Sequence, residues 1–222
     1  MATLFLVRHG QASFGADNYD QLSALGHRQC LRLGEYFRAR GQRFDTALSG
    51  TLQRQVQSLA AIAEGLQTPI EALRRPGLNE YDSAAVIASV HAQPLARPDT
   101  PELYRHHFRL LRQGLAAWMA GTVQPAGMPS YREFVAGVAE VLEQLRRHDA
   151  GDVLLVSSGG PIASAIGQVL GVAPQTTIDL NMRLRNSSVT EFAITPKRHM
   201  LVTYNTLPHL DSAEHAGWVT YS

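Results

Sequence analysis

Cysteine is nearly absent from this chain: Cys30 is the single one among 222 residues. One thiol cannot form an internal disulfide or a cysteine-based zinc cluster, so both are excluded. A chain without disulfides fits a reducing compartment, and we therefore expect a cytoplasmic protein. Cys30 itself falls on the apolar stripe of a predicted helix, where a thiol packs as a small apolar group.

Long hydrophobic runs and a strong net charge are also missing. No segment approaches the roughly 18 consecutive apolar residues of a membrane span, and no charged segment precedes the short apolar run at the N-terminus. We therefore expect neither a membrane span nor a signal peptide. The formal net charge is +1, so the overall charge does not predict nucleic-acid binding, and an anionic ligand would depend on locally placed arginines.

The chain does contain alternating strand and helix patterns, at a length that suits one domain over residues 1–222. Strands are predicted at 3–7, 44–48, 69–73, 152–156, 187–194 and 199–204. Helices are predicted at 23–40, with Ser23 as N-cap, at 52–64 and at 131–147. A further helix is predicted after the turn at 157–161 and ends at about residue 170. This alternation predicts a three-layer α/β/α sandwich with a mostly parallel central sheet. We expect residues 83–149 to form a helical insertion that caps the site.

Polar residues follow three of the predicted strands directly. The triplet Arg8-His9-Gly10 comes after the first strand, and Ser49 and Ser157 come after two others. The carboxyl ends of parallel strands meet at one edge of a sheet, where ligands bind. Histidine is a neutral nucleophile near pH 7, arginine grips phosphate oxygens, and glycine lets the backbone approach an anion. The triplet therefore suits attack on a phosphoryl group, although alone it also fits a surface turn.

Five further segments, together with the triplet, match the motifs of a known family in the same order along the chain. They are Leu22-Ser23-Ala24-Leu25-Gly26-His27-Arg28-Gln29, Ser49-Gly50-Thr51-Leu52-Gln53-Arg54, Leu78-Asn79-Glu80, Val156-Ser157-Ser158-Gly159-Gly160 and Asn186-Ser187-Ser188-Val189-Thr190. Together with the triplet they resemble the signature of the histidine phosphatase superfamily, the phosphoglycerate mutase-like group. The resemblance extends over nearly the whole chain.

The resemblance implies a role for each matched residue. His9 would be the nucleophile that forms a phosphohistidine, and Arg8 and Arg54 would clamp the phosphate. Glu80 would be the general acid that protonates the leaving oxygen and then the base that activates water. The implied partner is a small phosphomonoester, and the implied chemistry needs no metal and no cofactor.

One position departs from the family pattern. Ser158 stands where the family carries a histidine before its two glycines, and a hydroxyl brings a hydrogen bond without a positive charge. We expect Ser158 and the Gly159 amide to hold the phosphate in place of that histidine. Ser13 and Asn18, in the loop after the triplet, are candidates for further phosphate contacts.

Several residues allow a second interpretation. Arg54 fits a solvated helix arginine, and Glu80 fits an ordinary loop carboxylate, with Asp82 or Glu102 as the acid instead. His91 or His209 would be an alternative source of the missing cation. The pair His106-His107 invites a metal site, but neighbouring side chains on a helix point in different directions. The insertion arginines at 97, 105, 109 and 112 fit a solvated face or a second anion site.

Three functions therefore follow from the sequence. The first is a phosphatase of this superfamily. The second is a catalytically weak or inactive module that binds a phosphorylated ligand, which the serine at position 158 favours. The third is a phosphoglycerate mutase, and two features disfavour it. By the same resemblance, the mutase branch has Arg-His-Gly-Glu-Ser where this chain has Arg-His-Gly-Gln-Ala. That branch also carries a longer insertion, and this chain is short for it.

Overall fold

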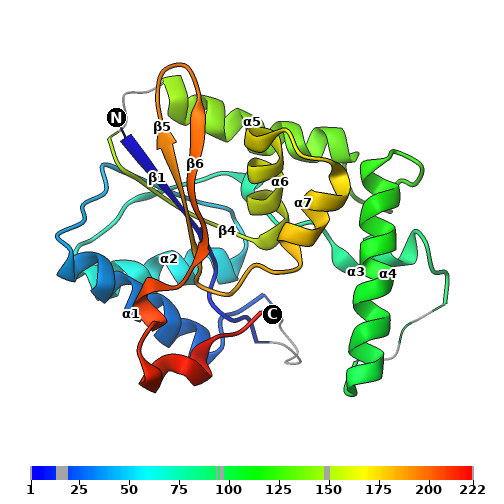
Figure 1. The fold of residues 1–222 in the computed structure, drawn as a ribbon, viewed down its shortest axis with the longest axis horizontal. Coiled ribbons are helices and arrows are strands. Elements are labelled where there is room, and N and C mark those ends of the chain that lie inside the picture. The colour runs from blue at the N-terminus through cyan, green and yellow to red at the C-terminus, as the bar shows by residue number, and fades with distance from the viewer. Residues whose placement is uncertain (1, 14–19, 94, 96–97, 148–150, 222) are drawn as a thin grey trace.

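The computed structural model describes residues 2–13, 20–93, 95, 98–147 and 151–221. Its centre is a six-stranded sheet in the order β3-β2-β4-β1-β5-β6 (Figure 1). The strands are β1 (Ala2–Arg8), β2 (Thr46–Ser49), β3 (Ala72–Arg74), β4 (Val153–Ser157), β5 (Val189–Ile194) and β6 (His199–Thr206). The first four are parallel, whereas β5 and β6 add antiparallel pairs at one side. The predicted fold class is confirmed.

The helices are α1 (Ala24–Ala39), α2 (Gln53–Leu66), α3 (Ser83–Ala88), α4 (Pro101–Met119), α5 (Tyr131–Arg147), α6 (Gly159–Leu170) and α7 (Pro174–Asn181). Ser23 is the N-cap of α1, as predicted, and its hydroxyl accepts from the Gly26 amide. The sequence analysis missed α7. It also placed the second strand two residues early and the third strand three residues early, because neither short run has a sharp local boundary signal.

Two apolar cores lie on opposite faces of the sheet, because successive strand residues point to opposite sides. On β4, Val153 and Leu155 enter the core that α5 and α6 cover. Leu154 and Val156 enter the core that α1 and α2 cover. The sheet is therefore buried on both faces, which explains the continuous apolar run of β4.

A third apolar core lies within the insertion and away from the sheet. It is built mainly from α3 and α4, and Ile178 of α7 joins it. Its members are Val86, Ile87, Leu110, Leu111, Leu115, Trp118 and Ile178. Figure 1 shows α4, in green, standing at one side of the molecule beside α7. Within the described residues, no helix is long and apolar enough to cross a membrane.

Two glycines let α1 and α2 approach closely. A Cβ added to Gly34 of α1 would lie 2.1 Å from the carbonyl oxygen of Ile62. A Cβ on Gly65 of α2 would lie 2.1 Å from the carbonyl oxygen of Leu31. Real Cβ atoms do not come this close to backbone, so the helices would have to separate.

We predict that Gly34→Ala lowers the free energy of unfolding by about 1–3 kcal/mol, the usual cost of overpacking a core. Urea unfolding followed by circular dichroism measures the change. Gly217→Ala is the matched control, because a Cβ there meets nothing within 4 Å. A Gly34→Ala midpoint equal to that of the control would contradict the packing argument.

Candidate active site

The nucleophile candidate follows β1 at the carboxyl edge of the sheet. The amide of His9 donates to the carbonyl of Ser157, 2.9 Å away, which ties the loop after β1 to the end of β4. The carbonyl of His9 accepts from the Ser187 amide and from Nδ2 of Asn186, both at 3.2 Å. Ser187 adopts a left-handed backbone conformation, with φ of 57°, at this contact. The backbone of His9 is therefore held on both sides.

The two partners of the imidazole fix its tautomer. Nδ1 of His9 lies 2.7 Å from the carbonyl oxygen of Gly10, which can only accept, so Nδ1 carries the proton. Nε2 lies 3.3 Å from Nε of Arg54, which can only donate, so Nε2 carries the lone pair. The ring is therefore neutral, with its basic nitrogen toward Arg54.

Burial and neighbouring charge both favour this neutral form. His9 is 3% exposed. Its pKa lies well below the ordinary value, first because the buried ring is desolvated and then because Arg8 and Arg54 are cationic. The hydrogen bond to Gly10 opposes this shift only partly. His9 therefore keeps its lone pair across the neutral pH range.

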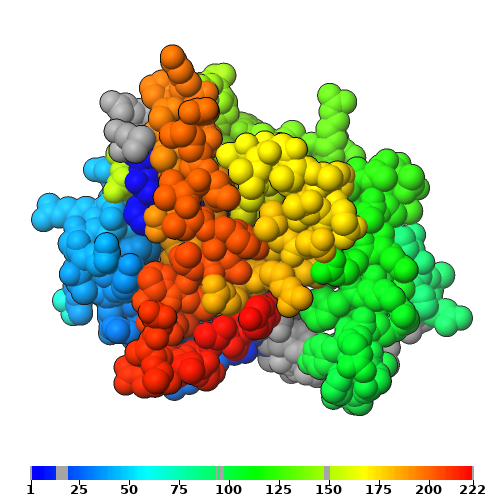
Figure 2. Space-filling model, viewed as in Figure 1, coloured from blue at the N-terminus to red at the C-terminus, as the bar shows by residue number. Residues whose placement is uncertain are grey.

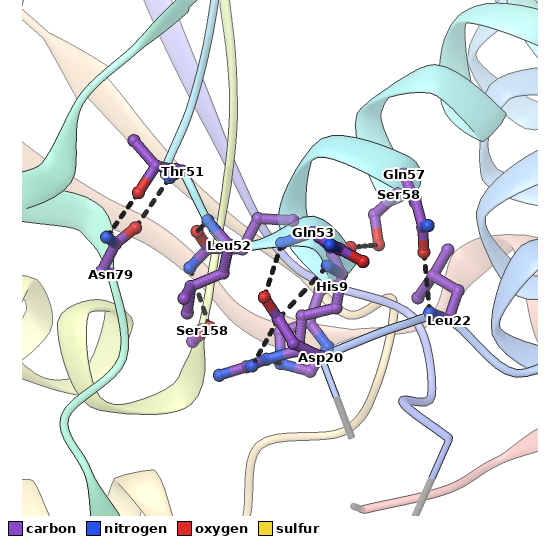
Figure 3. Close-up of polar contacts among 12 residues, drawn as sticks. His9, Asp20, Leu22, Thr51, Leu52, Gln53, Gln57, Ser58, Asn79 and Ser158 are labelled. Carbon is purple, nitrogen blue, oxygen red and sulfur yellow. Dashed lines mark hydrogen bonds and ion pairs between the residues drawn. The ribbon is translucent and has the colours of Figure 1, made fainter. Parts of the chain in front are cut away.

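Arg54 is the second residue of α2, and Asp20 orients it. Figure 3 shows Asp20 next to Gln53 at the start of this helix. The Asp20 carboxylate accepts from Nη1 of Arg54 at 2.7 Å and from the Gln53 amide at 2.9 Å. The same carboxylate thus satisfies a free amide at the start of α2 and fixes the guanidinium beside His9. Arg54 is 7% exposed, so the solvated-arginine interpretation is wrong.

Glu80 lies against the start of α6. Its carboxylate oxygens accept from the Gly160 amide at 3.0 and 3.2 Å. A Cβ on Gly160 would lie 2.2 Å from Oε1 of Glu80, so the carboxylate needs a glycine there. Burial raises the pKa of Glu80, while the Gly160 amide, Arg54 and Arg8 act in the opposite direction. A raised pKa is what a general acid requires.

Ser158 lies at the end of β4 and is fully buried. Its hydroxyl accepts from Nε2 of Gln55 at 2.9 Å, and that nitrogen also donates to the carbonyl of Leu78 at 2.9 Å. Through Gln55, Ser158 lies next to the first turn of α2, to the left of His9 and Asp20 in Figure 3. Gly159 follows as the first residue of α6.

Arg8 is the last residue of β1. Its Nη1 donates to the carbonyl of Leu184 at 2.5 Å and to the carbonyl of Tyr221 at 2.8 Å. Its charge lowers the pKa of both His9 and Glu80. The structure therefore brings Arg8, His9, Arg54 and Glu80 into one electrostatic cluster.

The remaining sequence candidates fall in different places. The Ser13 amide donates to the carbonyl of Gln21 at 2.7 Å, and its contact with phosphate stays a prediction. Asn18 lies outside the described residues. His209 is 2% exposed, and burial lowers its pKa to about 3, so it does not supply a cation at neutral pH. His91 packs against His106 in the insertion, with ring centroids 6.0 Å apart.

The insertion residues have partners of their own. Arg105 pairs with Glu102, Arg112 pairs with Asp179, and Arg109 contacts Nδ1 of His106 at 2.7 Å. These contacts lie on exposed surface, which favours the solvated-face interpretation for these three arginines. Arg97 lies outside the described residues. In the part of the chain that the structure describes, no group of three metal-ligating side chains is found.

A small aromatic cavity lies beside Gly160, at the start of α6. Tyr81, Trp118, Tyr131 and Phe134 line it together with Gly160 and neighbouring residues. Its volume of about 20 Å³ is room for one water. The aromatic side chains therefore leave little empty space next to the start of α6.

Comparison with known proteins identifies the family of this chain. The family model "Histidine phosphatase superfamily (branch 1)" matches residues 4–207. The chain belongs to the histidine phosphatase superfamily.

Curated relatives and solved structures are similar to this chain at modest identity. The 2,3-bisphosphoglycerate-dependent phosphoglycerate mutase of Methylorubrum populi is 27% identical over 189 residues, 81% of this chain and 84% of that protein. The mutase of the same description from Mesorhizobium japonicum is 32% identical over 87 residues, only 36% of this chain and 42% of that protein. The native mycobacterial glucosyl-3-phosphoglycerate phosphatase has a TM-score of 0.65 at 20% identity and covers 93% of this chain and 99% of its own.

Sequence reasoning missed three residues of the site. Asp20 sits in a polar loop without a spacing signal, and its partner Arg54 is 34 residues away. Gln55 follows Arg54 directly, but its position on the helix does not predict the hydrogen bond to Ser158, which is 103 residues away. Asn186 belongs to a quoted motif, yet its contact with the His9 carbonyl spans 177 residues.

The buried His209 generates a prediction about stability and pH. In the unfolded chain a histidine takes up a proton below about pH 6.5, whereas in the folded protein the pKa of His209 is about 3. Acid therefore favours unfolding, and the contribution of His209 is fully present above the unfolded pKa. Between about pH 7.5 and pH 5 we expect the contribution of His209 to the free energy of unfolding to fall by about 2 kcal/mol.

Urea unfolding of the wild type and of His209→Gln at both pH values measures this effect. The glutamine keeps a partner for Ser187, whose hydroxyl lies 2.9 Å from Nε2 of His209, but it does not titrate. The variant should show a smaller loss of stability in acid. Parallel losses in the two proteins would contradict the assignment.

Proposed function

We propose that this protein hydrolyses phosphomonoesters of small metabolites through a phosphohistidine on His9. The observation that carries the proposal is the neutral imidazole whose Nε2 lone pair faces the Arg54 guanidinium, 3.3 Å away. A nitrogen nucleophile beside fixed cations is suited to attack an anionic phosphoryl group. Membership of the superfamily supports the proposal, and so does the fold shared with a phosphatase.

In the first step, Arg8 and Arg54 neutralise the phosphoryl oxygens while Nε2 of His9 attacks phosphorus. The P–N bond forms as the P–O bond to the leaving group breaks. The protonated carboxyl of Glu80 gives its proton to the departing oxygen, which leaves as an alcohol. The raised pKa of Glu80 and the lowered pKa of His9 both suit these roles.

In the second step, water attacks the phosphorus of phospho-His9. The Glu80 carboxylate, now unprotonated, takes a proton from this water. The P–N bond breaks, inorganic phosphate is released, and His9 returns to its neutral form. None of these steps uses a metal or a cofactor.

Replacing the nucleophile tests the proposal directly. We expect His9→Ala to lower the hydrolysis of p-nitrophenyl phosphate on the order of 10³-fold or more, as loss of a nucleophile does elsewhere. His27→Ala is the matched control, because His27 is an exposed histidine of α1 paired with Glu64. Equal rates for His9→Ala and the wild type would contradict a phosphohistidine on His9.

Ser158 is proposed to donate to a phosphate oxygen together with the Gly159 amide. Gln55 already donates to the hydroxyl oxygen of Ser158, so the hydroxyl proton is the group that Ser158 can offer. It replaces the hydrogen bond of the histidine that the family resemblance implies, but not its charge. Ser13 and Asn18 remain proposed additional phosphate contacts.

We expect Ser158→Ala to lower turnover of p-nitrophenyl phosphate about tenfold, less than the 10²–10³ typical of a full oxyanion donor, because the Gly159 amide remains. Ser164→Ala, which changes a buried serine of α6, is the control. Turnover unchanged from the wild type would remove Ser158 from the phosphate site.

A phosphoglycerate mutase is the second candidate, and the curated relatives favour it. A mutase returns the phosphoryl group to a second hydroxyl, whereas a phosphatase passes it to water. Incubation with 3-phosphoglycerate separates them, since one product is 2-phosphoglycerate and the other is inorganic phosphate. Tight phosphate binding with no reaction on a broad panel of phosphometabolites would instead identify a binding module. The proposed setting for each of these activities is the cytoplasm.

A further inference from the structure

The C-terminal segment, residues 218–221, contacts Arg8 at the end of β1, Gln29 of α1, and Asn186 before β5. Figure 1 shows this segment, in red, running back to the loop after β1, and Figure 2 shows it on the molecular surface. Arg28 of α1 stacks over the ring of Trp218, 5.0 Å from its centroid. No motif in the sequence of this segment predicts a role for it.

A directed chain of hydrogen bonds links this segment to His9. Nε2 of Gln29 donates to the Thr220 hydroxyl at 3.0 Å, and that hydroxyl donates to Oδ1 of Asn186 at 2.9 Å. The Asn186 amide nitrogen Nδ2 then donates to the carbonyl of His9 at 3.2 Å. Gln29 and Asn186 are fully buried, so the loss of one link leaves polar groups without water.

Two more contacts tie the same segment to the residues around His9. Arg8 donates from Nη1 to the carbonyl of Tyr221 at 2.8 Å. The Gln11 amide donates to Oε1 of Gln29 at 2.9 Å, and Gln29 also donates to the carbonyl of Trp218 at 2.6 Å. The loop is thus anchored at positions 8, 9 and 11.

We propose that Thr220 is a positioning residue for the proposed hydrolysis. Its hydroxyl both accepts and donates, and this fixes which way the Asn186 amide points. With Oδ1 of Asn186 held by Thr220, Nδ2 must face the His9 carbonyl, which orients the nucleophile without touching substrate. This inference rests on the proposed function, since the benefit of the orientation is realised in the attack on phosphorus.

Thr220→Val tests the inference, because valine keeps the shape but neither accepts nor donates. We expect kcat for p-nitrophenyl phosphate to fall about tenfold, part of the hundredfold that a misplacement of about 1 Å can cost. KM should stay within about twofold, since Thr220 does not contact phosphate. Thr220→Ser should restore the rate, because it keeps the hydroxyl.

Thr203→Val is the matched control, since the Thr203 hydroxyl on β6 has no hydrogen-bond partner among the residues that the structure describes. Should Thr220→Val fold poorly, Thr220→Ala removes the same hydroxyl at a half-buried position. A wild-type kcat in the hydroxyl-free variants, or a Thr220→Ser rate as low as that of Thr220→Val, would overturn the proposal.

A second measurement does not depend on activity. The Nδ1–H proton of His9, bonded to Gly10, gives a signal in ¹H–¹⁵N imidazole spectra that His9→Ala identifies. Thr220→Val should broaden this signal and speed its exchange with water, whereas Thr203→Val should not. An unchanged signal would overturn the positioning role. A wild type that shows the expected signals but hydrolyses nothing would contradict only the proposed function.

Discussion

The active site depends on one constraint, the position of the His9 ring between a carbonyl that only accepts and a guanidinium that only donates. The Gly10 carbonyl is in place because the Gly10 amide donates to the Ser58 hydroxyl of α2. Arg54 is in place because Asp20 holds its other side. Both contacts are made by side chains of α2, Ser58 and Arg54. Much of the architecture on this face of the sheet thus serves the orientation of one imidazole.

Burial acts on the two proposed proton-handling groups in complementary directions. Desolvation disfavours charge, so it lowers the pKa of His9 and raises the pKa of Glu80. The two arginines lower the pKa of both groups. They therefore reinforce the neutral state of His9 while restraining the upward shift of Glu80. The site therefore combines the lone pair of a neutral His9 with the positive charge of both arginines.

Local signals predicted the frame of the molecule well. The apolar run of β4, the serine cap of α1 and the order of the polar strand ends are all visible within a few residues of sequence. Contacts between distant segments were beyond reach, as for Asp20 with Arg54 or Thr220 with Asn186, because no local spacing encodes which buried polar groups meet. α7 was missed because Pro174–Asn181 has only two residues, Thr177 and Ile178, buried, and so lacks a clear apolar stripe.

The separate core of the insertion has an evolutionary consequence. Because Trp118, Leu115 and Val86 pack among themselves and not against the strands, substitutions in α3 and α4 can accumulate without disturbing the sheet. The surface formed by α3 and α4 can then diverge in sequence and shape while the sheet and the surroundings of His9 stay the same.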